Sequence, residues 1–106
     1  MDTLKYPLEE LVKIKKKRFE QALLALEAAK EKLQQEEKKL QQLEAEKKTV
    51  LKHKEDKLAQ LRAALDEGAP TAKIKQIKVY LDLVKERLLE KEKKVQNQKK
   101  NVLNAE

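Results

Sequence analysis

The sequence lacks several residue types on which compact folds depend. Its 106 residues include no cysteine, no tryptophan, one glycine, two prolines and only two tyrosines and one phenylalanine. A packed core of this size normally draws on several aromatic side chains and several glycine-bearing turns. Without cysteine there is no disulfide framework, no thiol redox motif and no thiolate metal site. These absences argue against a compact globular domain.

Long apolar runs are also missing. No stretch approaches the roughly 18 apolar residues that a membrane span needs, and the opening lacks the apolar core of a secretory signal. We therefore expect a soluble chain of the intracellular type, with no membrane insertion.

What remains is charge and a regular apolar pattern. Charged residues make up 42% of the chain and apolar residues 40%. High charge favours disorder, but the apolar residues recur at regular spacing. A chain dominated by Ala, Glu, Lys, Leu and Gln with a periodic apolar stripe is typical of long helices and coiled coils. We therefore predict an all-α protein.

Helix-breaking residues stand at two places only. Pro7 suits a first helical turn, Gly68 suits the left-handed position after a helix, and Pro70 can open a second helix. Two helices joined by a short turn form an antiparallel hairpin. We predict a single long two-helix antiparallel coiled coil, with a helix over about 7–67, a turn over about 68–71 and a helix over about 72–106.

Apolar residues in the second helix alternate steps of three and four, as in a heptad seam. The seam reads Ile74, Ile77, Leu81, Val84, Leu88, Lys91, Val95, Gln98 and Val102.

The first helix carries a matching seam with one irregularity. Leu43, Lys47 and Leu51 follow one another in two steps of four, which predicts a stutter and local unwinding near Lys47. The seam continues through Lys54, Leu58, Leu61 and Leu65. Folding about the turn predicts four facing pairs: Ile74 with Leu65, Leu81 with Leu58, Leu88 with Leu51, and Val95 with Leu43.

The hairpin leaves residues 1–32 of the first helix unpaired, over roughly 40 Å. A bare apolar stripe of that length is unfavourable in water. We expect one of two explanations. Either this sequence is truncated at the C-terminus and the second helix continues in a longer native chain, or another chain covers the stripe.

The sequence offers no catalytic constellation, so we predict no enzyme activity, no cofactor and no metal. The single histidine, His53, stands in a lysine-rich stretch with no partner implied by its spacing. A nucleophile, a base and an orienting group must converge from several elements, and a rod has no cleft for them.

The net charge of +7 leaves three readings open. Favourable i,i+4 pairs such as Glu9–Lys13 and Glu90–Lys94 are typical of a solvated helix face. An acidic protein partner is the second reading, and nucleic acid or a membrane surface is the third and least supported.

Apolar residues off the seam also allow two readings. They are Val50, Tyr80, Leu83 and Leu89. They either widen the seam, as is common, or form a docking surface near the hairpin tip with Tyr80 as its aromatic anchor.

Short motifs at the opening, in the basic run, around the turn and in the second helix carry a family resemblance. They are Tyr6-Pro7-Leu8-Glu9, Ile14-Lys15-Lys16-Lys17-Arg18, Gln60-Leu61-Arg62 with Leu65-Asp66-Glu67-Gly68, Lys94-Val95, Gln98-Lys99 and Asn101-Val102-Leu103. In these motifs the chain resembles the stalk proteins of type III secretion, the YscO/SctO family with its flagellar relative FliJ. It is most similar to the chlamydial members, over essentially the whole chain.

The resemblance implies a stalk and two binding surfaces. The paired far ends would insert into the ring of a secretion ATPase, the tip region would bind the cytoplasmic domain of an export gate, and export chaperones are further partners of the family. The implied gate-binding residues are Val50, His53, Tyr80 and Val84, with Glu46 as a further position, and we add Leu83 to this predicted site as one of the off-seam apolar residues. The implied ATPase-facing residues are Leu4, Leu11, Lys13, Ile14, Lys16, Lys17 and Arg18.

The sequence thus predicts a non-enzymatic stalk, cytoplasmic and peripheral to a secretion apparatus at the inner membrane. It would link the ATPase ring to the export gate. The alternative is a generic coiled-coil scaffold that oligomerises through residues 1–32.

Overall fold

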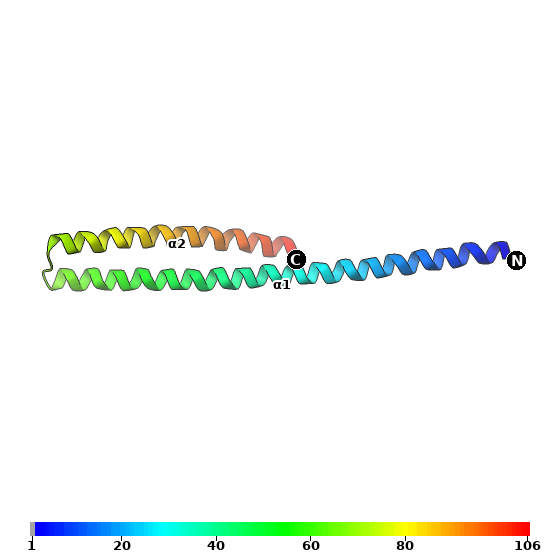
Figure 1. The fold of residues 1–106 in the computed structure, drawn as a ribbon, viewed down its shortest axis with the longest axis horizontal. Helices are drawn as coiled ribbons and strands as arrows, with labels where there is room; N and C mark the ends of the chain where they lie inside the picture. The colour runs from blue at the N-terminus through cyan, green and yellow to red at the C-terminus, as the bar shows by residue number, and fades with distance from the viewer. Residues whose placement is uncertain (1) are drawn as a thin grey trace.

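Two helices account for the fold. The computed structural model describes the backbone of residues 2–106 and the side chains of residues 7–106. Helix α1 spans Asp2–Asp66 and helix α2 spans Thr71–Ala105, and the two run antiparallel along a rod measuring 101 × 14 × 14 Å (Figure 1). The predicted all-α hairpin is confirmed. Figure 1 also shows that α2 ends beside the middle of α1, so the N-terminal part of α1 extends alone.

The turn is built around Gly68, which has a φ of 67°. Its N–H donates to the Leu65 carbonyl at 3.3 Å, and the Ala69 N–H donates to the Ala64 carbonyl at 2.9 Å. These two bonds define a Schellman motif, which requires a left-handed residue directly after the helix. Pro70 then precedes α2, and its carbonyl accepts from Lys73 N at 3.0 Å. Glycine is the residue that adopts this left-handed conformation most readily, as the sequence predicts.

The helices meet along a regular heptad seam. Counted from the turn, the seam positions are all buried or half-buried and alternate steps of three and four on both helices; Glu46 and Leu58 of α1 and Glu92 of α2 are half-buried beside them. On α1 they are Ala64, Leu61, Lys57, Lys54, Val50, Lys47, Leu43, Leu40, Glu36 and Leu33. On α2 they are Ile74, Ile77, Leu81, Val84, Leu88, Lys91, Val95, Gln98, Val102 and Ala105.

The predicted stutter near Lys47 is wrong. Val50 is half-buried, whereas Leu51 is 40% exposed; Ala64 is 5% exposed, whereas Leu65 is 54% exposed. The seam therefore continues from Lys47 to Val50 by a step of three, and nowhere does it contain two consecutive steps of four. A stutter would unwind the supercoil locally, and the continuous register avoids this. In consequence, the seam positions level with Leu88 and Ile74 are Val50 and Ala64, not Leu51 and Leu65.

The start of α1 also differs from the expectation. Pro7 was predicted in the first helical turn, but α1 begins at Asp2 and Pro7 lies inside it. Proline in a helix removes one bond, here from residue 7 to the carbonyl of Thr3. Because this position is close to the helix start, few intrahelical bonds precede it and the helix continues through it.

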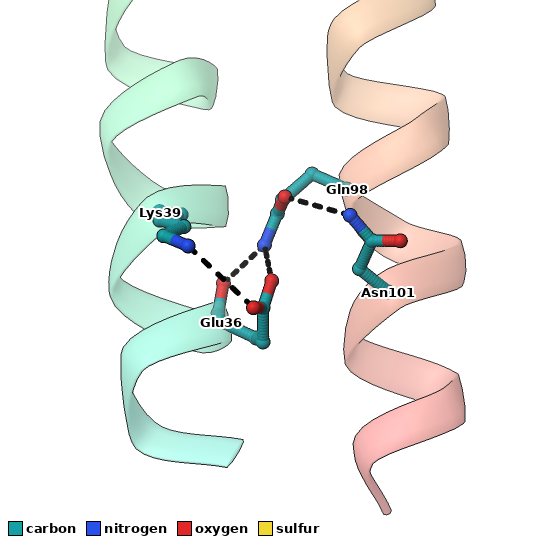
Figure 2. Close-up of polar contacts among 4 residues, drawn as sticks. All are labelled: Glu36, Lys39, Gln98 and Asn101. Carbon is teal, nitrogen blue, oxygen red and sulfur yellow. Dashed lines mark hydrogen bonds and ion pairs between the residues drawn. The ribbon is translucent and has the colours of Figure 1, made fainter. Parts of the chain in front are cut away.

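Polar side chains join the helices where the seam is least apolar. The Lys91 Nζ lies 2.7 Å from Glu46 Oε2. This ion pair neutralises the charge of Lys91, which stands at a seam position opposite Lys47. Further from the turn, the buried Gln98 amide donates to the Glu36 carbonyl at 2.9 Å and also to the Glu36 carboxylate (Figure 2). Asn101 donates to Gln98 Oε1 at 3.2 Å, and Lys39 Nζ lies 3.6 Å from Glu36 Oε1. These contacts satisfy polar groups that would otherwise oppose helix pairing.

The same contacts lower the pKa of both glutamates. The hydrogen bond from Gln98 is the main cause at Glu36, partly offset by desolvation, and the hydrogen bond and charge of Lys91 are the main causes at Glu46. A carboxyl whose pKa is lower in the folded chain stabilises the fold most above its unfolded value of 4.5. That contribution is lost as the pH falls through the folded-state pKa.

We predict that the urea midpoint of the hairpin decreases as the pH is lowered from about 5 to about 3. Replacing both acids, Glu36→Gln with Glu46→Gln, should flatten this decrease, because neither contact then depends on a carboxylate. The measurement is far-UV circular dichroism during urea titration at each pH. The exposed pair Glu37→Gln with Glu44→Gln serves as the matched control. An unchanged pH dependence in the Glu36/Glu46 variant would contradict this explanation.

Candidate docking site

Two adjoining grooves flank Tyr80 in the half of the hairpin nearest the turn. They have volumes of about 460 and 400 Å³, and Lys57, Gln60 and Tyr80 contribute to both. The groove nearer the turn is also lined by Ala63, Ala64, Glu67, Lys73, Gln76 and Ile77. The other is also lined by His53, Asp56, Leu83, Val84 and Arg87. We call this pair the Tyr80 grooves.

Lys57 holds the aromatic ring at the centre of these grooves. Its Cα stands at a seam position of α1, yet its Nζ lies 4.7 Å from the centroid of the Tyr80 ring and donates to Gln60 Oε1 at 3.1 Å. A lysine stem can line an apolar seam while its ammonium reaches the surface. A cation over an exposed aromatic face is worth about 0.5–1 kcal/mol. Tyr80 is 54% exposed, so its ring contacts Lys57 and remains accessible.

The structure brings together four of the five residues predicted to bind an export gate. His53, Tyr80, Leu83 and Val84 line one groove. Val84 is only 6% exposed, so it belongs to the seam beneath this groove and offers little contact area.

Val50 does not lie off the seam as predicted. It is half-buried at a seam position and is absent from both groove linings. The reason is the uninterrupted register, which turns Val50 toward α2 and Leu51 outward. Glu46 likewise pairs with Lys91.

Sequence reasoning missed most of the groove lining. Three of the missed residues are Lys57, Gln60 and Arg87. Two of them had a usable signal. Gln60 follows His53 by seven residues, and Arg87 follows Tyr80 by seven, so each shares a helix face with a residue already singled out. Lys57 had no such signal, because its role depends on how the side chain leaves the seam.

The second surface is the unpaired part of α1, over residues 7–32, which we call the overhang. Every residue of it is exposed. Its apolar side chains include Leu8, Val12, Phe19, Leu23, Leu24 and Leu26, and α2 does not extend far enough to cover them (Figure 1).

The residues predicted to face the ATPase fall in the overhang, apart from Leu4, whose side chain lies outside the described residues. Lys13, Ile14 and Lys17 join Glu10 in a shallow hollow. Leu11, Lys16 and Arg18 are exposed around the same turns of the helix. The overhang therefore presents apolar and basic groups all around one helix and does not form a concave site.

Neither surface assembles the groups needed for metal binding. Within residues 7–106, no three His, Asp or Glu side chains gather as a metal would require. His53 is exposed beside Asp56, Lys57 and Arg87 in a groove wall. In the part of the chain that the structure describes, neither helix has an apolar stretch of the length and composition that crosses a bilayer.

Comparison with known proteins places the chain in a family. It matches the family model described as YscO-like protein over residues 3–106, a range that includes both the overhang and the Tyr80 grooves. No curated protein and no solved structure matches it. The resemblance is thus confirmed at the level of the family, while the similarity to chlamydial members stays a prediction. The chain belongs to the YscO-like family, which suggests a stalk-type component of type III secretion.

Proposed function

We propose that this chain is a non-enzymatic stalk that links a secretion ATPase ring to an export gate. The observation that carries the proposal is the separation of two different surfaces on one stiff rod. The overhang is a single basic and apolar helix, while the Tyr80 grooves lie on the paired helices about 60 Å away, counted from Ile14 to His53 at 1.5 Å per residue. The family match supports a place in the secretion apparatus.

The two surfaces suit two kinds of contact. Exposed leucines and lysines around one helix can be gripped from several sides, as a ring would do, without a preformed pocket on the stalk. The Tyr80 grooves offer a local anchor for a folded domain, since an accessible aromatic ring beside apolar walls is typical of binding hot spots. The proposed mechanism is mechanical: one end sits in the ring, and the tip region biases the gate. Export chaperones are further candidate partners. The proposal places the protein in the cytoplasm, peripheral to the apparatus at the inner membrane.

The gate contact predicts a large effect at one side chain. Tyr80→Ala should weaken binding to the purified cytoplasmic domain of the cognate export gate about thirtyfold, as expected for a hot spot worth about 2 kcal/mol. Helicity should be unchanged, because the Tyr80 side chain lies outside the seam. Isothermal titration calorimetry measures the affinity and circular dichroism the helicity.

Val79→Ala is the matched control, because Val79 is exposed and next in sequence but is absent from both groove linings. Equal affinity of the Tyr80 and Val79 variants would remove the gate contact from the Tyr80 grooves.

The ATPase contact predicts an effect of charge in the overhang. Lys16→Glu with Lys17→Glu should reduce stimulation of the cognate secretion ATPase at least about tenfold, because reversed charges disturb electrostatic complementarity at an interface. Phosphate release by the purified ATPase is the measurement. Lys75→Glu with Lys78→Glu makes the same change in net charge near the turn and should leave stimulation intact. Normal stimulation by the Lys16/Lys17 variant would refute this contact.

The alternative, a generic scaffold that oligomerises through residues 1–32, is favoured by one observation. The apolar residues of the overhang are exposed along one unpaired helix, and such a stripe can pair with another copy. Sedimentation velocity of the purified chain separates the two functions. A stable oligomer that does not bind the ATPase or the gate would support the scaffold.

A further inference from the structure

A second apolar surface lies near the turn and takes no part in the proposed contacts. Leu51, Leu58 and Leu65 follow one another at intervals of seven residues on α1, so they form one line along the helix. Leu51 and Leu65 are 40% and 54% exposed, and Leu58 is half-buried. We call this line the leucine stripe. It borders the α1–α2 seam, but α2 covers it only in part.

The leucine stripe and the Tyr80 grooves lie on opposite sides of the hairpin. Each leucine is followed two residues later by a residue that lines a groove, namely His53, Gln60 and Glu67. Two residues correspond to about 200° of rotation in a helix with 3.6 residues per turn. A partner on the leucine stripe therefore need not compete with a partner at Tyr80.

The leucine stripe has the spacing of a second seam. Together with Lys54 and Leu61, its residues alternate steps of three and four: Leu51, Lys54, Leu58, Leu61 and Leu65. This is the pattern into which another helix packs. The α1–α2 seam uses Lys54 and Leu61 as well, but takes Val50, Lys57 and Ala64 in place of the three leucines. α1 thus presents two overlapping seams, and α2 occupies one of them.

The charges beside the leucine stripe are mainly positive. Apart from the residues that line the Tyr80 grooves, α1 carries two acids within four residues of the stripe, Glu55 and Asp66, against five basic residues, Lys47, Lys48, Lys52, Lys54 and Arg62. Lys47 also shares a hollow with Glu92 of α2, which identifies the side of α2 that borders the stripe. Lys85 and Lys78 precede Glu92 by seven and fourteen residues, so they continue along that side. Leucines framed by lysines are complementary to an apolar helix face framed by acids.

We propose that the leucine stripe binds an amphipathic helix of a partner protein whose apolar face is flanked by glutamate or aspartate. A second copy of this chain fits the surface poorly. The chain carries a net charge of +7, and its lysine-rich faces would meet one another in such a dimer. The third helix would lie beside α1 on the side away from Tyr80 and would convert this half of the hairpin into a three-helix bundle.

The test uses a designed helical peptide of three heptads, labelled with a fluorophore. It has leucine at heptad positions a and d and glutamate at e and g; a second peptide has lysine at e and g. Binding to the full chain is followed by fluorescence anisotropy at low and at physiological salt. We expect the glutamate peptide to bind at least about tenfold more tightly than the lysine peptide, with a difference that decreases as salt is added.

Variants locate the binding surface. Leu51→Gln with Leu65→Gln should abolish binding of the glutamate peptide while preserving helicity, because neither residue is a position of the α1–α2 seam and their exposed fractions are already 40% and 54%. Tyr80→Ala on the opposite side and Leu23→Gln with Leu26→Gln in the overhang are controls and should bind normally.

Four results would each overturn the proposal. They are no binding of the glutamate peptide, equal binding of the two peptides, equal binding by the Leu51/Leu65 variant, and loss of binding in the overhang variant. A chain that forms dimers by sedimentation, and loses them in the Leu51/Leu65 variant, would overturn it in favour of self-association. Tyr80→Ala enters this test only as a control, and no export-gate domain is used, so the outcome is independent of the gate contact.

Discussion

The register of α1 against α2 determines the rest of this structure. Once Val50 follows Lys47 in the seam, every later position is set by the heptad: Lys57 enters the seam, Ala64 reaches the turn, and the leucine stripe turns outward. Lys57 enters at little cost because its stem lines the seam and its ammonium reaches Tyr80. The polar pairs formed by Glu46 and Glu36 fix the same register further from the turn. A buried polar group that is satisfied in only one alignment is a common way to specify register in coiled coils.

The rod has three chemically different surfaces, of which the register determines the two near the turn and the shorter length of α2 determines the third. The overhang is a single exposed helix, the Tyr80 grooves have apolar and mixed-charge walls, and the leucine stripe is framed by lysines. All of them expose apolar or aromatic side chains that suit contact with other proteins. Under the stalk function that we propose, these surfaces would hold several partners at fixed spacing along one rod.

Much of the fold could be predicted from the sequence because it depends on local signals. Gly68 followed by Pro70 locates the turn, and the absence of glycine and proline from residues 8–67 and 71–106 gives two long helices. The finer register could not be read in the same way. Leu51 and Leu65 have larger apolar side chains than Val50 and Ala64. A seam chosen by apolar side chains alone therefore takes the two leucines, which is the wrong register. The correct choice depends on the continuity of both helices over the whole contact. The same holds for the candidate docking site. His53 and Tyr80 could be predicted from the sequence, whereas the part played by Lys57 depends on its contact with Tyr80 on the other helix.

The most direct measurement of this register is disulfide formation between engineered cysteines, which a chain without cysteine permits. One double variant carries Val50→Cys with Leu88→Cys, and the other carries Leu51→Cys with Leu88→Cys. Intramolecular crosslinking under mild oxidation is followed on non-reducing gels, because a disulfide forms only when the two Cβ atoms are close together. The structure predicts fast crosslinking at Val50 and slow crosslinking at Leu51. Faster crosslinking at Leu51 would place the leucine stripe inside the seam and would contradict the register on which these surfaces depend.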